Sequence, residues 1–207
     1  MRIAGIYLAA GQSSRMGVPK VSLKLPGKVS LGSAALSELE GCGLAPLIVV
    51  VRADDNLAWL PPAAEGSVRR TETCLTAHLG LSFSLRCGLN AVMPLQPDAV
   101  VVALADQPFI TASMVNRLTD TYKRNPELDY VSSANDGLAM PPALFSRSMF
   151  TALQGLDGDK GAAALLRNED YRGMILEAES GRSFLDADTP ADFGEISRQW
   201  SLQQNGN

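Results

Sequence analysis

The first twenty residues constrain the fold most, because a short apolar run leads directly into a loop of small residues. Residues 3–8 (IAGIYL) contain β-forming side chains and are too few for a helix, which predicts a buried strand. Residues 9–20 (AAGQSSRMGVPK) then combine glycines with one arginine and one lysine. Small residues let a ligand approach the backbone, and successive N–H groups can bind an anion. The stretch therefore predicts a loop that holds the phosphates of a nucleotide.

The spacing in this loop excludes two common phosphate-binding motifs. A Walker A loop requires G-x-x-x-x-G-K-[ST], whereas here Gly11 and Gly17 are followed by Lys20 and Val21. A dinucleotide fingerprint requires G-x-G-x-x-G, and no second glycine stands two residues after Gly11. By pattern alone, a serine-rich surface turn after an edge strand remains an alternative.

The composition predicts one soluble α/β domain. The chain has 207 residues, 46% of them hydrophobic and 19% charged, so we expect one domain over residues 1–200 and a frayed tail over 201–207. A net charge of −4 argues against a nucleic-acid partner, and no apolar run reaches the roughly 18 residues of a membrane span. Three cysteines without C-x-x-C spacing predict neither a disulfide framework nor a zinc site. We expect a cytoplasmic protein.

Strand-like and helix-like stretches alternate along the chain, which predicts βαβ units and a mostly parallel sheet. After the first strand, the expected strands are 46–52, 71–74, 99–105, 130–133, 140–145, 174–177 and 183–185. The expected helices are 31–42, a short one within 54–65, 80–90, 111–124, 146–153, 159–167 and one from residue 190 onward. Ser82 or Ser84 is expected to cap the helix at 80–90, and Thr189 with Pro190 to begin the last one.

Three aspartates are candidates for a site at the carboxyl edge of this sheet, where ligands of open α/β sheets bind. Asp106 follows the strand 99–105, and Asp186 and Asp188 stand just before the final helix. Turn formation or helix capping is the alternative role for each of them. The lone His78 is a poor candidate for a catalytic base, and no Ser/His/Asp or Cys/His arrangement is evident.

Nucleotidyl transfer would use the loop and the aspartates together. A phosphate monoester has a second pKa of about 6, so this nucleophile is largely dianionic at neutral pH and needs no general base. Catalysis then consists of positioning and charge neutralisation. Mg²⁺ binds one or two carboxylates together with phosphate oxygens. We expect Asp106 with one or both of Asp186 and Asp188 to hold the ion, while Arg15 and Lys20 face the triphosphate.

The residues Leu8 to Lys20 resemble L-A-A-G-x-S-x-R-M-G-x-x-K, the signature loop of the MobA-like nucleotidyltransferases, which attach CMP or GMP to molybdopterin. Four further segments resemble motifs of this family, in the expected order. They are GLSFSLRCGL at 80–89, LADQP at 104–108, LDGDKGA at 156–162 and DADTP at 186–190. The resemblance spans residues 3 to about 195 and is closest to the molybdenum cofactor cytidylyltransferases.

This resemblance implies a Rossmann-like three-layer α/β/α sandwich, similar to the nucleotide-diphospho-sugar transferases, and a role for each motif. It implies catalytic roles for Arg15, Lys20 and Asp106, metal binding by Asp106, Asp186 and Asp188, and acceptor contacts by Pro141, Asp159 and Gly161. It implies nucleotide binding by Leu8, Ala9, Ala10, Gly11, Ser13, Ser14, Arg15, Lys20, Gly80, Ser82, Ser84 and Leu85.

The implied reaction is the Mg²⁺-dependent transfer of CMP from CTP to the phosphate of molybdopterin, with release of pyrophosphate. A molybdenum hydroxylase of the xanthine dehydrogenase type, as apo-enzyme, would then be a partner. Guanylyl-transferring relatives tend to have L-A-G-G where this chain has Leu8-Ala-Ala-Gly11, so the methyl group of Ala10 would narrow the base pocket and favour a pyrimidine. Met140 stands where relatives often have the histidine of G-H-P, which leaves the acceptor open.

Three alternatives remain from the sequence. In the first, the enzyme uses GTP instead of CTP. In the second, it transfers the nucleotide to another phosphorylated acceptor, such as a sugar phosphate or an isoprenoid precursor. In the third, the protein is a non-catalytic carrier of molybdopterin.

Overall fold

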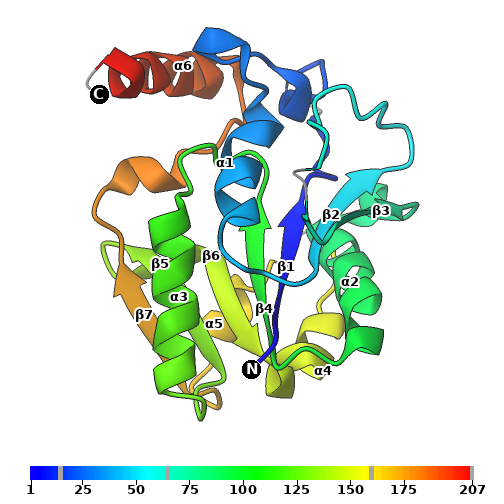
Figure 1. Ribbon diagram of the computed structural model, residues 1–207, viewed down its shortest axis with the longest axis vertical. Helices are drawn as coiled ribbons and strands as arrows, with labels where there is room; N and C mark the ends of the chain where they lie inside the picture. The colour runs from blue at the N-terminus through cyan, green and yellow to red at the C-terminus, as the bar shows by residue number, and fades with distance from the viewer. Residues whose placement is uncertain (14–15, 64–65, 159–160, 206–207) are drawn as a thin grey trace.

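The computed structural model describes residues 1–13, 16–63, 66–158 and 161–205 (Figure 1). Its sheet has seven strands in the order β3-β2-β1-β4-β6-β5-β7. The strands are β1 (Ile3–Leu8), β2 (Leu47–Arg52), β3 (Arg69–Cys74), β4 (Ala99–Leu104), β5 (Tyr130–Asn135), β6 (Leu138–Ser146) and β7 (Gly173–Glu177). Neighbouring strands are parallel except where β6 pairs with β4 and β5. The predicted mostly parallel sheet is confirmed.

Helices cover both faces of the sheet and complete the predicted three-layer sandwich. They are α1 (Leu31–Glu40), α2 (Leu81–Val92), α3 (Ala112–Arg124), α4 (Phe150–Gln154), α5 (Ala163–Leu166) and α6 (Pro190–Asn205). One apolar cluster joins α1 and α3 to one face, and a second joins α2, α4 and α5 to the other. Helix α6 lies apart from these layers, near the carboxyl edge of β1 and β4 (Figure 1). No helix in the described ranges is both long enough and apolar enough to span a membrane.

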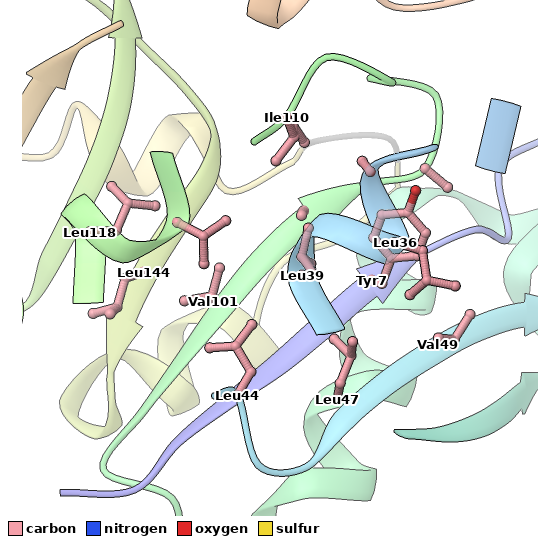
Figure 2. Packing of buried hydrophobic residues seen from close by; sticks show 14 of the residues in the cluster. Tyr7, Leu36, Leu39, Leu44, Leu47, Val49, Val101, Ile110, Leu118 and Leu144 are labelled. Carbon is pink, nitrogen blue, oxygen red and sulfur yellow. The ribbon is translucent and has the colours of Figure 1, made fainter. Parts of the chain in front are cut away.

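The strands are apolar on both faces because helices cover both sides of the sheet. Successive residues of a strand point to opposite sides, so each side of a doubly covered sheet needs its own apolar set. Tyr7 packs with Leu36 and Leu39 of α1 on one side (Figure 2), while Ile6 packs with Leu89 of α2 on the other. The buried Tyr7 hydroxyl donates to the carbonyl of Gly32 at 2.9 Å. Burial raises its pKa, so the phenol stays neutral.

Two predicted elements are wrong. The described part of 54–65 holds no helix, because the side chains of Asp55 and Asn56 accept hydrogen bonds from the backbone two residues onward and fix turns instead. Residues 183–185 are not a strand, since a 3-10 turn occupies Gly181–Phe184.

Three other predicted regions differ in extent. The helix expected at 159–167 is reduced to α5 in the described residues, and residues 159–160 lie outside them. The segment 140–145 belongs to the longer strand β6, which forms an antiparallel hairpin with β5. Helix α6 continues through Asn205, into the tail that we expected to fray.

Two helix starts match their prediction. The hydroxyl of Thr111 accepts a hydrogen bond from the backbone N–H of Met114 at 3.3 Å. Thr189 and Asp192 form a reciprocal capping box: the Asp192 carboxylate accepts from the Thr189 N–H at 2.7 Å, and the Thr189 hydroxyl accepts from the Asp192 N–H at 3.2 Å. These caps fix where α3 and α6 leave the carboxyl edge.

Substitution of Gly88 tests how closely α2 packs on the sheet. A Cβ at this position would lie 2.5 Å from Ile6 Cγ2 and 3.0 Å from Val50 Cγ2. We expect Gly88→Ala to lower the free energy of unfolding by about 1–3 kcal/mol, as overpacked cores do. Gly194→Ala in α6 is the matched control, because a Cβ there meets nothing within 4 Å. Urea unfolding followed by circular dichroism would contradict the packing if Gly88→Ala were as stable as the wild type.

Candidate active site

The carboxyl ends of β1 and β4 form the centre of the candidate site. From β1 the chain proceeds to β2 and β3 on one side, and it returns to β4 on the other side of β1. Ligands bind at such a switch point in open α/β sheets. The N–H of Ala9 donates to Val50 and that of Ala105 to Leu8, at 2.9 and 3.0 Å. The loop after β1 and Asp106 after β4 therefore emerge side by side.

Lys20 links the loop to the acidic residues. Its Nζ lies 2.5 Å from Asp106 Oδ2 and 3.2 Å from Asp188 Oδ1, and the side chain is only 11% exposed. Its backbone N–H donates to the Ser13 hydroxyl at 2.8 Å, which fixes the fold of the loop. Burial alone would lower the pKa of Lys20, but Asp106 and then Asp188 raise it above its ordinary value. Lys20 is therefore a fixed positive charge.

Asp106, Asp186 and Asp188 form one cluster, in which one oxygen from each carboxylate lies within 4.8 Å of the others. Between the last two, Ala187 is fully buried in an apolar cluster with residues of α1, α6 and the adjoining loops. Its N–H donates to the carbonyl of Asp106 at 3.2 Å, which holds the segment against the end of β4. Burial, and then repulsion from Asp106 and Asp188, raise the pKa of Asp186. Several carboxylate oxygens with one nearby ammonium fit a hard divalent cation such as Mg²⁺.

A cavity of about 540 Å³ lies between the loop after β1 and the segment after β2, and it is lined by Pro19 and Val21, the residues on either side of Lys20. It is lined by Ala9, Gly11, Gln12, Ser13, Gly17, Val18, Pro19, Val21, Ser22, Arg52, Asp54, Asp55 and Asn56. The Arg52 guanidinium donates to both Asp54 oxygens, at 2.8 and 2.9 Å. Sequence reasoning assigned no role to residues 52–56. They reach the site because β2 lies next to β1, a neighbour relation that no local pattern in the sequence encodes.

A second, apolar pocket of about 200 Å³ lies on the α2 face. It brings together residues expected on the nucleotide side and residues expected on the acceptor side. Its lining consists of Leu8, Leu81, Ser82, Leu85, Val102, Leu104, Ala139, Pro141, Ala143, Phe145, Gly161, Ala162, Ala163 and Leu166. The Ser82 hydroxyl is buried and has no hydrogen-bond partner among the described residues.

The remaining predicted site residues take other positions. Gly80 is the N-cap of α2 at φ 126°, a backbone conformation that favours glycine, and neither predicted serine caps this helix. Ser84 is buried inside α2, and Ala10 is 1% exposed in the core on the same face. Neither lines the two cavities described above. Ser14, Arg15 and Asp159 lie outside the described residues.

Comparison with known proteins agrees with this geometry. The model of the MobA-like NTP transferase domain matches residues 5–173. The chain is 33% identical to the purine catabolism protein PucB of Bacillus subtilis (strain 168) over 205 residues, which cover 96% of this chain and 98% of PucB.

Two solved structures are similar over nearly the whole chain. One is the homologue of Rv0371c from Mycobacterium sp. strain JC1, with 28% identity, a TM-score of 0.79, and 96% and 98% of the two chains covered. The other is molybdopterin-guanine dinucleotide biosynthesis protein A from Archaeoglobus fulgidus, with 19% identity, a TM-score of 0.68, and 98% and 100% covered, which shows the shared fold. The chain therefore belongs to the MobA-like NTP transferase family and is a nucleotidyltransferase.

Proposed function

We propose that this enzyme transfers CMP from CTP to the phosphate of molybdopterin and releases pyrophosphate. The observation that carries the proposal is Lys20, held between Asp106 and Asp188 beside a cavity that suits a nucleotide. The similarity to PucB, a purine catabolism protein, supports supply of the product to a hydroxylase of the xanthine dehydrogenase type. The apo-form of that hydroxylase would be the protein partner, and we expect both in the cytoplasm.

The strand order supports an arrangement of the two substrates side by side along the carboxyl edge of the sheet. The large cavity lies over β1 and β2, the aspartate cluster lies at β4, and the apolar pocket reaches β4 and β6. CTP would occupy the large cavity with its base toward Arg52 and its α-phosphate toward Asp106. Molybdopterin would enter from the β6 side, so that its phosphate meets the α-phosphate at the cluster.

The reaction requires the protein to position the two substrates and to neutralise their phosphate charges. A phosphate oxygen of the acceptor attacks the α-phosphorus, and the bond from that phosphorus to the pyrophosphate oxygen breaks. Lys20 neutralises the triphosphate and keeps it near the cluster. Asp106 and Asp188 would hold Mg²⁺, which neutralises phosphate charge when bound; Asp186 is the more exposed member and would complete the ligand set.

The choice of CTP is supported by the segment Leu8-Ala-Ala-Gly11. Since the Ala10 methyl packs in the core, it would act on the base through the position of the Gly11 backbone rather than by contact. We expect pyrophosphate release with molybdopterin and Mg²⁺ to have a kcat/KM at least tenfold higher for CTP than for GTP. A preference for GTP would overturn the choice of CTP but leave the proposed nucleotidyl transfer to molybdopterin in place. A chain that binds molybdopterin and releases no pyrophosphate with either nucleotide would be a carrier.

A further inference from the structure

We infer that the apolar pocket on the α2 face seats an uncharged ring of the acceptor and that Ser82 donates or accepts the hydrogen bond that orients it. This inference rests on the proposed function, because it assigns a binding site to the acceptor of the proposed reaction. It differs from the role in nucleotide binding that the resemblance implies for Ser82.

The pocket has the size and chemistry of a ring site. An apolar cavity of roughly 150 Å³ is known to hold a benzene molecule, so about 200 Å³ suits one or two fused rings. Its described lining contains no charged side chain, so a phosphate would lose its hydration there without compensation. Leu81, Leu104, Ala139, Pro141 and Gly161 are partly exposed, so the pocket opens to solvent. Polar atoms at the outer edge of a bound ring would stay hydrated.

The Ser82 hydroxyl is the polar group in this apolar lining, and its surroundings do not satisfy it. The residue is 0% exposed, and its oxygen has no partner among the described residues. Ser82 is the second residue of α2, so no helical turn precedes it to supply the carbonyl that a serine within a helix often bonds. A buried hydroxyl without a partner costs free energy, which a hydrogen-bonding ligand would recover.

The position of the pocket connects it to the reaction. Leu8 and Leu104 line it and are the last residues of β1 and β4, and Asp106 follows Leu104 by two residues. An acceptor whose phosphate lies at the aspartate cluster would therefore extend its other end into the pocket. The Ser82 N–H donates to Gly158 at 3.1 Å, and Arg86 donates to the carbonyl of Leu156 at 2.7 Å. These bonds hold Leu156 and Gly158 against α2, the helix that carries Leu81, Ser82 and Leu85 of the pocket lining.

Two kinds of variant test the inference in the full-length enzyme. Ser82→Ala removes the hydrogen bond, whereas Ala143→Leu fills the pocket; Ala163→Leu fills it from α5 if Ala143→Leu fails to fold. Ser146→Ala is the matched control, because it removes a buried serine of β6 that does not line the pocket and that points to the other face of the sheet from its neighbour Phe145. With molybdopterin as acceptor, we expect Ser82→Ala to raise the acceptor KM by about 5- to 20-fold. We expect the filling variant to raise it further, with the KM for CTP within twofold of the wild type in both.

Calorimetry with 6-hydroxymethylpterin, which has the two fused pterin rings but no phosphate, separates this inference from the proposed function. Binding that is weakened by Ser82→Ala and by the filling variant supports the pocket. Equal binding by all variants, absent binding to the wild type, or an unchanged acceptor KM during turnover overturns it. If the wild type releases no pyrophosphate from CTP when molybdopterin is the acceptor, the proposed function fails, and the ring-binding result still decides whether the pocket binds a ring.

Discussion

Replacing Lys20 by alanine should lower kcat for pyrophosphate release by about 10²- to 10³-fold, the usual effect of removing one fixed group that stabilises transition-state charge. The ammonium of Lys20 is buried, charged and shared by Asp106 and Asp188, so water cannot replace it at the same position. Lys24→Ala is the control: this nearby lysine contacts the Ser30 hydroxyl at 2.6 Å and not the cluster. We expect its kcat to stay within twofold of the wild type.

Two further measurements support the interpretation of Lys20→Ala. Circular dichroism should show a folded variant. Lys20→Arg should recover little activity, because a guanidinium is planar and larger than an ammonium and does not fit the same two carboxylates. Full pyrophosphate release by Lys20→Ala would remove Lys20 from the mechanism.

Replacing Asp106 by alanine should have the larger effect, a loss of at least about 10³-fold in kcat that added Mg²⁺ does not restore. Asp106 follows the central strand β4, pairs with Lys20 and belongs to the carboxylate cluster, so the change removes a metal ligand and frees Lys20 from its shorter contact. Asp106→Asn keeps the shape of the side chain and tests whether charge is what matters. Asp120→Asn on α3, which is exposed beside Lys123, is the surface control. Wild-type turnover by Asp106→Ala would disprove its assignment.

The parts of the site that the sequence could predict are those carried by short continuous segments. The loop after β1, Asp106 after β4 and the aspartates before α6 each follow an apolar run or precede a helix cap, and the sheet brings their ends to one edge. Parallel strands end on the same edge, so identifying β1 and β4 was enough to group the loop with Asp106. Asp186 and Asp188 follow a 3-10 turn instead of the predicted strand, and the hydrogen bond from the Ala187 N–H to the Asp106 carbonyl holds them at the same edge.

The hairpin of β5 and β6 was missed although the sequence contained a signal for it. Asp136 and Gly137 stand between the two strands with φ of 51° and 76°. Asp-Gly with positive φ at both residues is typical of a two-residue hairpin turn. The presence of β6 between β4 and β5 is what brings Pro141 into the lining of the apolar pocket.

The contacts that depend on packing between distant segments could not be predicted from one sequence. Arg52 and Asp54 face the large cavity because β2 lies next to β1, a neighbour relation that no local pattern encodes. Ser82 could be expected as a helix cap or a ligand contact. Its burial without a hydrogen bond to any described residue follows only from the way α2 packs on the sheet.

A crystal structure with CTP and Mn²⁺, located by its anomalous signal, is the most direct measurement of the central claim. The ion should lie among the carboxylates of Asp106 and Asp188, with the triphosphate beside Lys20 and the base toward Arg52. A nucleotide bound away from Lys20, or an ion that touches neither of these aspartates, would contradict the enzyme described above.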